Sequence, residues 1–159
     1  MIKKILISLK SLGLKKTAIK IIFKIFNFFS LKLYKRKKFE KNLFKIRSIE
    51  ERFNKIYYTN YWLDSESRSG TGSSLKSTKN VRFHLPKIIE RFKIKRLFDA
   101  PCGDFNWMSK VLKDIDIDYT GADIVEDLIV SNKKNKKNNI KFIKLDIRID
   151  KLPASDLMI

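Results

Sequence analysis

The sequence predicts an α/β protein in which a basic helical arm precedes a parallel β-sheet. From Lys95 onward, short apolar segments alternate with helical segments, the order that builds a parallel sheet with right-handed crossovers. The positive charge is concentrated upstream: residues 1–60 hold 17 Lys or Arg against 3 Asp or Glu, and residues 61–159 hold 19 against 14. We therefore expect an arm at residues 1–56 and an α/β domain at residues 57–159.

The arm is predicted to contain one or two amphipathic helices within residues 2–34, with a break near Gly13. Apolar residues recur there at helical spacings, and lysines recur every four residues on the opposite side. The longest uncharged run among these lysines, Ile25–Leu31, has seven residues, whereas a membrane span needs roughly 20. The pattern is typical of a helix at a membrane surface, and the alternative is a helix that packs on its own domain or on a partner, with its lysines merely solvated.

The positive charge of the arm leaves three interpretations open. Lysines and interleaved aromatic residues are compatible with RNA as well as with anionic lipid, although no nucleic-acid-binding motif accompanies them. A coding bias towards Lys, Ile, Asn and Phe would produce the same composition without a function. The predicted location is cytoplasmic, with peripheral contact at the inner face of the membrane through residues 2–34 as one interpretation.

Cysteine and histidine are scarce in this chain. The only cysteine is Cys102 and the only histidine is His84, so an internal disulfide is excluded and a reducing compartment is favoured. The same scarcity argues against a zinc site and against a Ser-His-Asp triad, and no metal is expected.

The elements after the arm follow in order. The Ser- and Gly-rich stretch Asn60–Ser74 predicts an irregular boundary segment, and residues 74–92 predict helix, with Pro86 opening a second helix at its first turn. Strands are then predicted at 96–99, 119–123, 140–146 and 156–159, and helices at 106–112 and 125–137.

Each of the first three predicted strands ends in an aspartate: Asp99, Asp123 and Asp146. The intervals between them are 24 and 23 residues, which suits one βα unit each. Parallel strands bring these carboxylates to one edge of the sheet, where open α/β sheets bind ligands. A carboxylate can accept hydrogen bonds from ribose hydroxyls or an adenine amino group, and Gly103 allows close approach of the backbone. The pattern predicts a cofactor that contains a nucleoside.

The turn after the first strand distinguishes between cofactor classes. A dinucleotide fold needs G-x-G-x-x-G so that pyrophosphate can bind at a helix N-terminus, and residues 101–106 lack two of the three glycines. Asp104 in this turn would also repel a phosphate. S-adenosyl-L-methionine has no phosphate and carries positive charge, so it suits the acidic turn better.

The stretches "LFDAPCGDFNWM", "YTGADI", "FIKLDIR" and "LPASDLMI" together resemble the first half of a class I S-adenosylmethionine-dependent methyltransferase. The upstream stretch "YWLDSESRSGTGSSLKSTKNVRFHLPKII" resembles the corresponding region of a group of bacterial methyltransferases. The resemblance covers about residues 57–159 and implies a Rossmann-like parallel sheet with helices on both faces. It implies methyl transfer to an unknown acceptor, and together with the basic arm it suggests lipid-linked glycans or other cell-surface precursors.

The resemblance also implies roles for individual residues. Asp123 would hold the ribose hydroxyls with Ile124 beside the adenine, Asp146 and the backbone of Ile147 would contact the adenine edge, and Asp156 would face the transferred methyl group. The loop around the methionine part would consist of Asp99, Ala100, Pro101, Cys102, Gly103 and Asp104. This chain departs from the family loop, acid-x-G-x-G-x-G, with proline at the first glycine position and Phe105 at the third.

Two further features are predicted near the cofactor. Three residues of "SRSGTGS", Arg68, Gly70 and Gly72, either fold over the site as a lid, or grip the cofactor carboxylate, or belong to a flexible linker. No residue stands out as the catalytic base, and Asp104 and Asp156 are candidates by location only.

The sequence stops at Ile159, inside the fourth predicted strand, whereas the resembled fold has further strands. We therefore expect a truncated cofactor-binding half. We expect these 159 residues to bind the cofactor weakly, if at all, and to catalyse nothing. Micromolar binding in a calorimetric titration would contradict this expectation.

Overall fold

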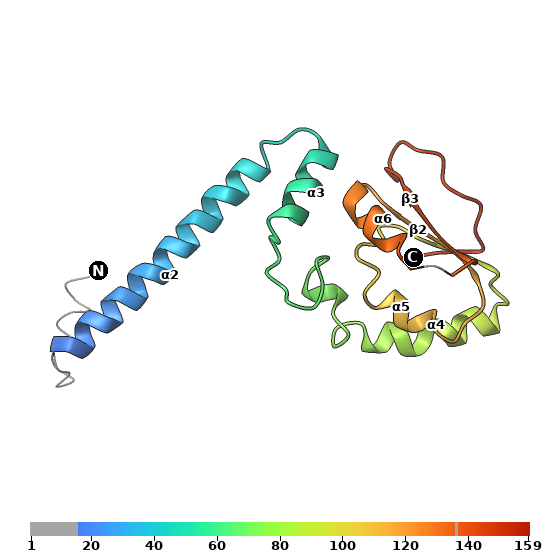
Figure 1. Cartoon of the computed structure of the whole chain (residues 1–159), viewed down its shortest axis with the longest axis horizontal. Helices are drawn as coiled ribbons and strands as arrows, with labels where there is room; N and C mark the ends of the chain where they lie inside the picture. The colour runs from blue at the N-terminus through green and yellow to red at the C-terminus, as the bar shows by residue number, and fades with distance from the viewer. Residues whose placement is uncertain (1–15, 136) are drawn as a thin grey trace. The chain divides into compact units, whose positions relative to one another are not determined.

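The computed structural model describes residues 16–135 and 137–159 (Figure 1). The chain divides into two compact units, residues 1–47 and 48–159. The boundary predicted between residues 56 and 57 falls inside helix α3 (Ile49–Tyr58), all of which belongs to the second unit.

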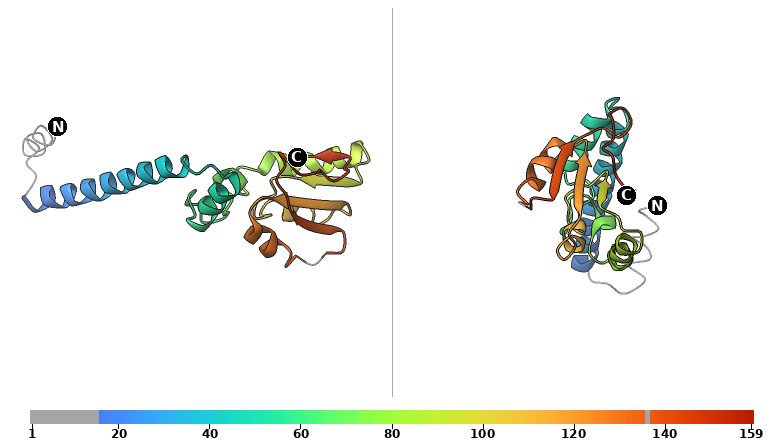
Figure 2. Two further views of the ribbon diagram at one scale, coloured as in Figure 1. Left: turned by 90° about the horizontal axis from the view of Figure 1, so that it is seen from above. Right: turned by 90° about the vertical axis from the view of Figure 1, so that its right-hand side faces the viewer.

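The first unit contains α2 (Lys16–Leu43), a continuous and straight helix of 28 residues (Figures 1 and 2). It continues past the predicted segment because residues 35–43 contain no glycine or proline and are mostly good helix formers. Residues 2–15, with the predicted break near Gly13, lie outside the described residues. None of the helices in the described part of the chain is long and apolar enough to cross a membrane.

The second unit begins with α3, whose start is fixed by a side-chain cap. The Ser48 hydroxyl accepts a hydrogen bond from the backbone N–H of Glu51 at 3.2 Å, and acidic residues occupy the first turn, where they complement the helix dipole. An irregular segment follows, as predicted, and contains only a short 3-10 turn, η1 (Thr71–Ser73).

Helix α4 (Lys79–Arg91) differs from the prediction at Pro86. The sequence predicts that this proline opens a second helix, but Pro86 lies inside one continuous helix. The proline lacks the N–H that would bond back to Arg82. The helix continues through it because Leu85 and Ile89, on either side of the proline, are both buried in the core.

The sheet has four parallel strands in the order β3-β2-β1-β4. These strands are β1 (Arg96–Asp99), β2 (Asp118–Asp123), β3 (Ile140–Lys144) and β4 (Leu157–Met158). In the register, Leu97 lies opposite both Tyr119 and Leu157. The predicted α/β fold with a Rossmann-like parallel sheet and a preceding helix is confirmed.

The two helices between the strands are shorter than predicted. Helix α5 (Met108–Val111) begins later than predicted, and helix α6 (Glu126–Asn132) ends well before the predicted residue 137. After Asn132 the sequence KKNKKNN offers no apolar side chain to bury, and helical stability in proteins comes mainly from packing of an apolar face.

Two buried clusters lie on opposite faces of the sheet because alternate strand residues point to opposite sides. One cluster joins Leu97, Tyr119 and Phe142 of three strands to apolar residues of α4, α5 and α6. The other consists of Phe98, Ala100, Ala122 and Leu145, from strands and strand ends. This packing fixes the carboxyl ends of β1, β2 and β3, where the predicted site residues lie.

Candidate ligand-binding site

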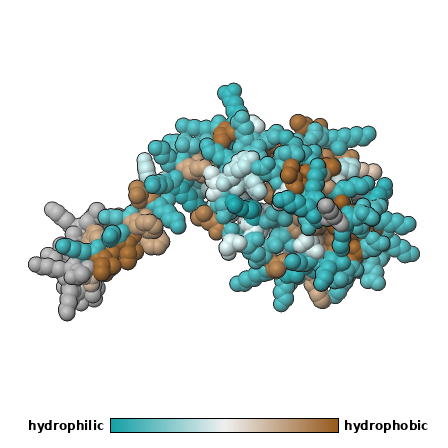
Figure 3. Space-filling view, in the orientation of Figure 1, coloured by the Kyte–Doolittle hydropathy of each residue, from teal (hydrophilic) through white to brown (hydrophobic). Residues whose placement is uncertain are grey.

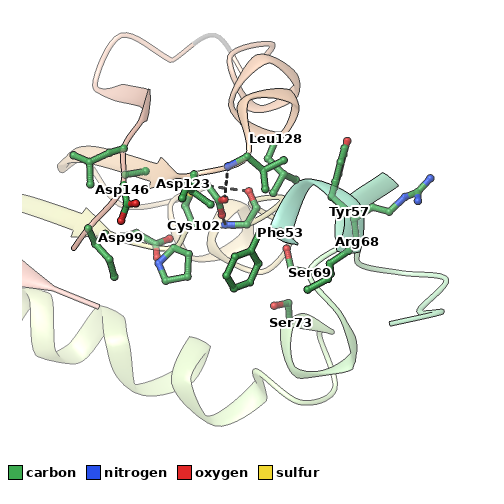
Figure 4. A pocket seen from close by; sticks show the side chains of 18 of the residues that line it. Phe53, Tyr57, Arg68, Ser69, Ser73, Asp99, Cys102, Asp123, Leu128 and Asp146 are labelled. Atoms are coloured by element: carbon green, nitrogen blue, oxygen red, sulfur yellow. Dashed lines mark hydrogen bonds between the residues drawn. The ribbon is translucent and has the colours of Figure 1, made fainter. Parts of the chain in front are cut away.

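A cavity of about 440 Å³ lies at the carboxyl edge of the sheet, within the second unit (Figure 4). Asp99, Asp123 and Asp146 all line it, so the structure brings the three strand-end aspartates together. Six further predicted residues line the same cavity: Arg68, Pro101, Cys102, Gly103, Ile124 and Ile147.

Asp123 is buried at the end of β2, where two backbone amides hold its carboxylate. Its Oδ2 accepts from Gly103 N–H at 3.0 Å and its Oδ1 accepts from Val125 N–H at 3.0 Å (Figure 4). Burial raises the pKa of Asp123, and these backbone hydrogen bonds oppose the rise. The carboxylate is therefore oriented by the chain, and each oxygen keeps further acceptor capacity for a ligand hydroxyl.

Asp99 is buried at the end of β1 beside the aromatic core. Its Oδ2 accepts a hydrogen bond from the Tyr119 hydroxyl at 2.7 Å. The pKa of Asp99 is raised to about 7, mainly by burial; the Tyr119 hydrogen bond opposes the rise and the nearby charge of Asp123 adds to it. A positive group placed in the cavity would favour the ionised form of this carboxyl.

Asp146 is more exposed and follows β3. It binds its neighbour Arg148 through the guanidinium and also accepts from the Arg148 backbone N–H at 3.0 Å. The hydrogen bond from the Arg148 side chain lowers the pKa of Asp146. The cavity rim at β3 therefore carries an ion pair, whereas its floor carries two buried carboxyls.

In the turn after β1, residues 100–106, the backbone N–H groups all donate to acceptors within the protein. The N–H groups of residues 102 to 106 bond to Ala122 O, Asp123 Oδ2, Ser69 Oγ, Cys102 O and Asp104 Oδ1 respectively. Ala100 N–H bonds to Ile159 O, and proline at 101 has no N–H. None of these amides is left to bind a phosphate group.

Gly103 is the position in the turn that most needs glycine. Its φ is +56°, and a Cβ built there would lie 2.2 Å from Ser69 Oγ. Ser69 Oγ also accepts from Asp104 N–H at 2.9 Å, so the segment before α4 is seated directly on the turn.

Asp104 fixes that segment and does not line the cavity. Its Oδ2 accepts from the Ser67 hydroxyl at 2.9 Å and from Arg68 N–H at 2.7 Å. Asn106 adds hydrogen bonds to Glu66 Oε1 and to Ser73 O. The "SRSGTGS" stretch is thus a docked segment, with Arg68, Ser69 and Ser73 among the cavity-lining residues.

Five predicted residues do not line the cavity. Ala100 belongs to the buried cluster on the other face of the sheet, and Gly70 packs against Trp62, with a φ of +95°. Gly72 lies in η1, and Asp104 holds the docked segment. Asp156 lies before β4, at the opposite edge of the sheet, where its carboxylate accepts from the N–H groups of Lys95 and Arg96.

The position of Asp156 corrects the expectation that it faces the cofactor. The Arg96 guanidinium also binds it, at 2.8 Å, and this side-chain bond lowers the pKa of Asp156 to about 2. The physical reason is that Asp156 precedes its strand, whereas Asp99 and Asp123 end theirs. Neither Asp104 nor Asp156, the two candidates for the base, lines the cavity.

Helix α3 forms an apolar wall of the cavity, although the boundary predicted from the sequence assigns most of this helix to the arm. The wall consists of Ile49, Phe53, Ile56 and Tyr57 (Figure 4). Tyr58 donates to Asp127 Oδ2 of α6 at 2.6 Å, and Lys144 of β3 donates to Glu50 Oε1 at 2.6 Å. The helical spacing of these apolar residues predicts a buried face, but it does not say which surface the face covers.

Cys102 lines the cavity as a buried thiol. Burial raises its pKa, with the charges of Asp99 and Asp123 adding to the rise. The buried Asn132 side chain donates to Gly103 O at 2.8 Å and so supports the turn from the α6 side. A thiol in this environment stays protonated and acts as a packing group.

A comparison with known protein families finds no family that matches the chain, and a comparison with curated proteins finds no match.

Proposed function

We propose that the cavity binds S-adenosyl-L-methionine and that the protein is a methyltransferase of the class I type that its sequence resembles. The observation that carries this proposal is the convergence of three strand-end carboxylates on one largely apolar cavity. A volume of about 440 Å³ falls within the range of small-molecule sites.

The donor and acceptor groups of the cavity favour a cationic nucleoside over a nucleotide. Asp99 and Asp123 offer acceptors for ribose hydroxyls and an ammonium group, and their ionised forms attract a sulfonium by charge. The backbone amides of residues 100–106 are all used within the protein, so the turn offers no cradle for pyrophosphate. Buried carboxyls would in addition repel phosphate.

Each group of the cavity has a role in this proposal. Asp123, held by Gly103 and Val125 N–H, would accept from the ribose hydroxyls. Asp99 would face the positively charged methionine part, and Arg68 supplies a cation for its carboxylate. Apolar residues of α3 and Ile147 would cover the adenine and exclude water.

When bound, S-adenosyl-L-methionine supplies a methyl group on a sulfonium sulfur that an acceptor nucleophile displaces in line. The contribution of this chain is orientation, because its carboxylates fix the nucleoside and thereby the direction of the methyl group. Tyr119 keeps the Asp99 carboxyl in place for that purpose. We assign no catalytic base and no acceptor.

The test is a ligand comparison on the full chain by saturation-transfer NMR and calorimetry. We expect weak, saturable binding of S-adenosyl-L-methionine and S-adenosylhomocysteine, with each competing against the other. NAD⁺ serves as the matched control because it shares the adenosine but adds pyrophosphate, and we expect no binding of NAD⁺. Binding of NAD⁺ equal to or tighter than that of S-adenosyl-L-methionine would contradict the proposal, as would no binding of either at millimolar concentrations.

A further inference from the structure

Helix α2 of the first unit carries an exposed apolar side. Ile21, Ile25 and Phe29 follow one another at intervals of four residues, and Ile22 and Phe26 lie beside them on the same side of the helix. All five are exposed, and Phe29 is 58% exposed. Large apolar side chains gathered in this way on one side mark an interaction surface. Figure 3 shows apolar side chains gathered along α2 beside hydrophilic ones.

The opposite side of α2 is polar and basic in its first two turns and then carries the apolar Leu31. Lys20, Lys24 and Asn27 recur at intervals of four and three, and Leu31 is the next residue on that line. Beyond it the helix carries a run of cations, Lys35 to Lys38, all of them exposed. The apolar side and this cationic run belong to one rigid element.

We propose that α2 lies along the surface of a membrane containing anionic lipid. The apolar side, defined by Ile21, Ile22, Ile25, Phe26 and Phe29, enters the boundary between headgroups and acyl chains. The lysines at 20, 24, 35, 37 and 38 remain among the headgroups. Charge complementarity supports this partner, because the cytoplasmic leaflet is negative and each nearby lysine adds attraction.

A second copy of this chain fits the surface less well. The apolar side spans adjacent positions such as 21 and 22 as well as 25 and 26, and is therefore wider than a two-stranded coiled-coil seam. Parallel pairing would also bring the two Lys35–Lys38 runs together, and like charges repel.

RNA would contact the lysines of α2 favourably but not its apolar side. Phosphates would satisfy the lysines, but they would leave the five apolar side chains in water. A bilayer surface can accommodate the apolar side and the lysines of α2 at the same time.

The experiment measures co-flotation of the full chain with vesicles across a salt series. The vesicles are phosphatidylcholine alone or an equal mixture of phosphatidylcholine and phosphatidylglycerol. We expect binding to the mixed vesicles, weaker binding as salt rises, and much weaker binding to phosphatidylcholine alone. Equal binding to both vesicle types, or none to either, would overturn the proposal.

A matched pair of variants tests the geometry of the helix. Phe29→Ser removes an apolar side chain from the proposed membrane side and should weaken binding about tenfold. Leu31→Ser removes one from the opposite side and should leave binding unchanged. Both residues are exposed and both variants should keep the helical circular dichroism of the parent. Equal effects of the two variants would contradict the proposed orientation.

Charge variants and two counter-assays complete the test. Lys35→Gln combined with Lys37→Gln and Lys38→Gln should weaken binding to the mixed vesicles about tenfold or more, and the difference should shrink at high salt. If the parent chain dimerises but does not bind vesicles, and Phe29→Ser abolishes the dimer, then self-association replaces the proposal. Retention of an RNA oligonucleotide without vesicle binding would replace it with nucleic-acid binding. Ligand binding in the cavity is a separate readout, so failure of either proposal leaves the other intact.

Discussion

Aspartates at the two edges of the same sheet have opposite environments and opposite pKa shifts. At the carboxyl edge, Asp99 and Asp123 are buried beside a cavity, and burial raises the pKa of both. At the amino edge, Asp156 is exposed and bound by Arg96, which lowers its pKa to about 2. A carboxyl that is buried with no cation beside it can still change its protonation when a ligand binds. A carboxyl that already forms an ion pair within the protein stabilises the fold instead.

The largest effect is expected from changing Asp99, the buried carboxyl at the end of β1. Its pKa rises from 3.8 to about 7 in the folded protein, so the folded state binds the proton more tightly. The resulting stability is complete below about pH 4 and is lost as pH rises through 7, at about 1.4 kcal/mol for each unit of pKa difference.

The check for this effect is urea unfolding across pH 4 to 8 for the parent and for Asp99→Asn. The asparagine stays neutral and can still accept from the Tyr119 hydroxyl. We expect the difference in unfolding free energy between the two proteins to grow with pH in favour of the variant. Parallel pH profiles would show that Asp99 titrates as an ordinary carboxyl.

The second prediction concerns the turn that holds Asp123. Gly103→Ala places a Cβ 2.2 Å from Ser69 Oγ at a positive φ, and should cost about 1–3 kcal/mol of unfolding free energy. Gly72→Ala is the control, because nothing lies within 4 Å of the position that its added methyl group would take, and little change is expected. Chemical denaturation measures both. A neutral Gly103→Ala would contradict the described seating of Ser69 on the turn.

The third prediction contrasts the two ends of β2. Asp123→Asn removes the charged acceptor of the cavity and should weaken binding of S-adenosylhomocysteine about tenfold or more. Asp118→Asn changes the same residue type at the exposed amino end of the strand and should have no effect. Calorimetry or ligand-observed NMR measures both affinities. If the two variants bind S-adenosylhomocysteine with equal affinity, Asp123 does not contact the ligand.

The smallest effect is expected at Asp156. Because its folded pKa is about 2, below the ordinary 3.8, its contribution to stability is present above about pH 4 and is lost as pH falls towards 2. Asp156→Asn should therefore be slightly less stable than the parent at neutral pH and equally stable near pH 2. Ligand binding should not change. Loss of binding in this variant would place Asp156 back at the site.

The sheet and the meeting of the three aspartates could be predicted from the sequence because strand ends and intervals of about one βα unit are local signals. The prediction for Asp156 is wrong because a residue before a strand and a residue after a strand both look like an acid beside an apolar run. Only the register, with Leu157 opposite Leu97, shows that Asp156 lies at the amino edge.

The wall formed by α3 was not predictable for a different reason. Phe53 and Tyr57 lie one turn apart and predict an apolar face, but the surface under that face depends on contacts far along the chain. Tyr58 to Asp127 and Lys144 to Glu50 join residues 69 and 94 positions apart. The predicted start of a second helix at Pro86 was wrong because core packing on both sides of the proline outweighs one lost hydrogen bond.

A carbon-13 NMR titration of the Asp99 and Asp123 side-chain carboxyls, with and without S-adenosyl-L-methionine, tests most directly whether the buried carboxyls of the cavity respond to a cationic ligand. We expect a pKa of Asp99 near 7 in the free protein that falls when this cation binds, and we expect binding to leave the Asp156 resonance unchanged. A pKa of Asp99 near 4 in the free protein, or one that the ligand leaves unchanged, would contradict this expectation.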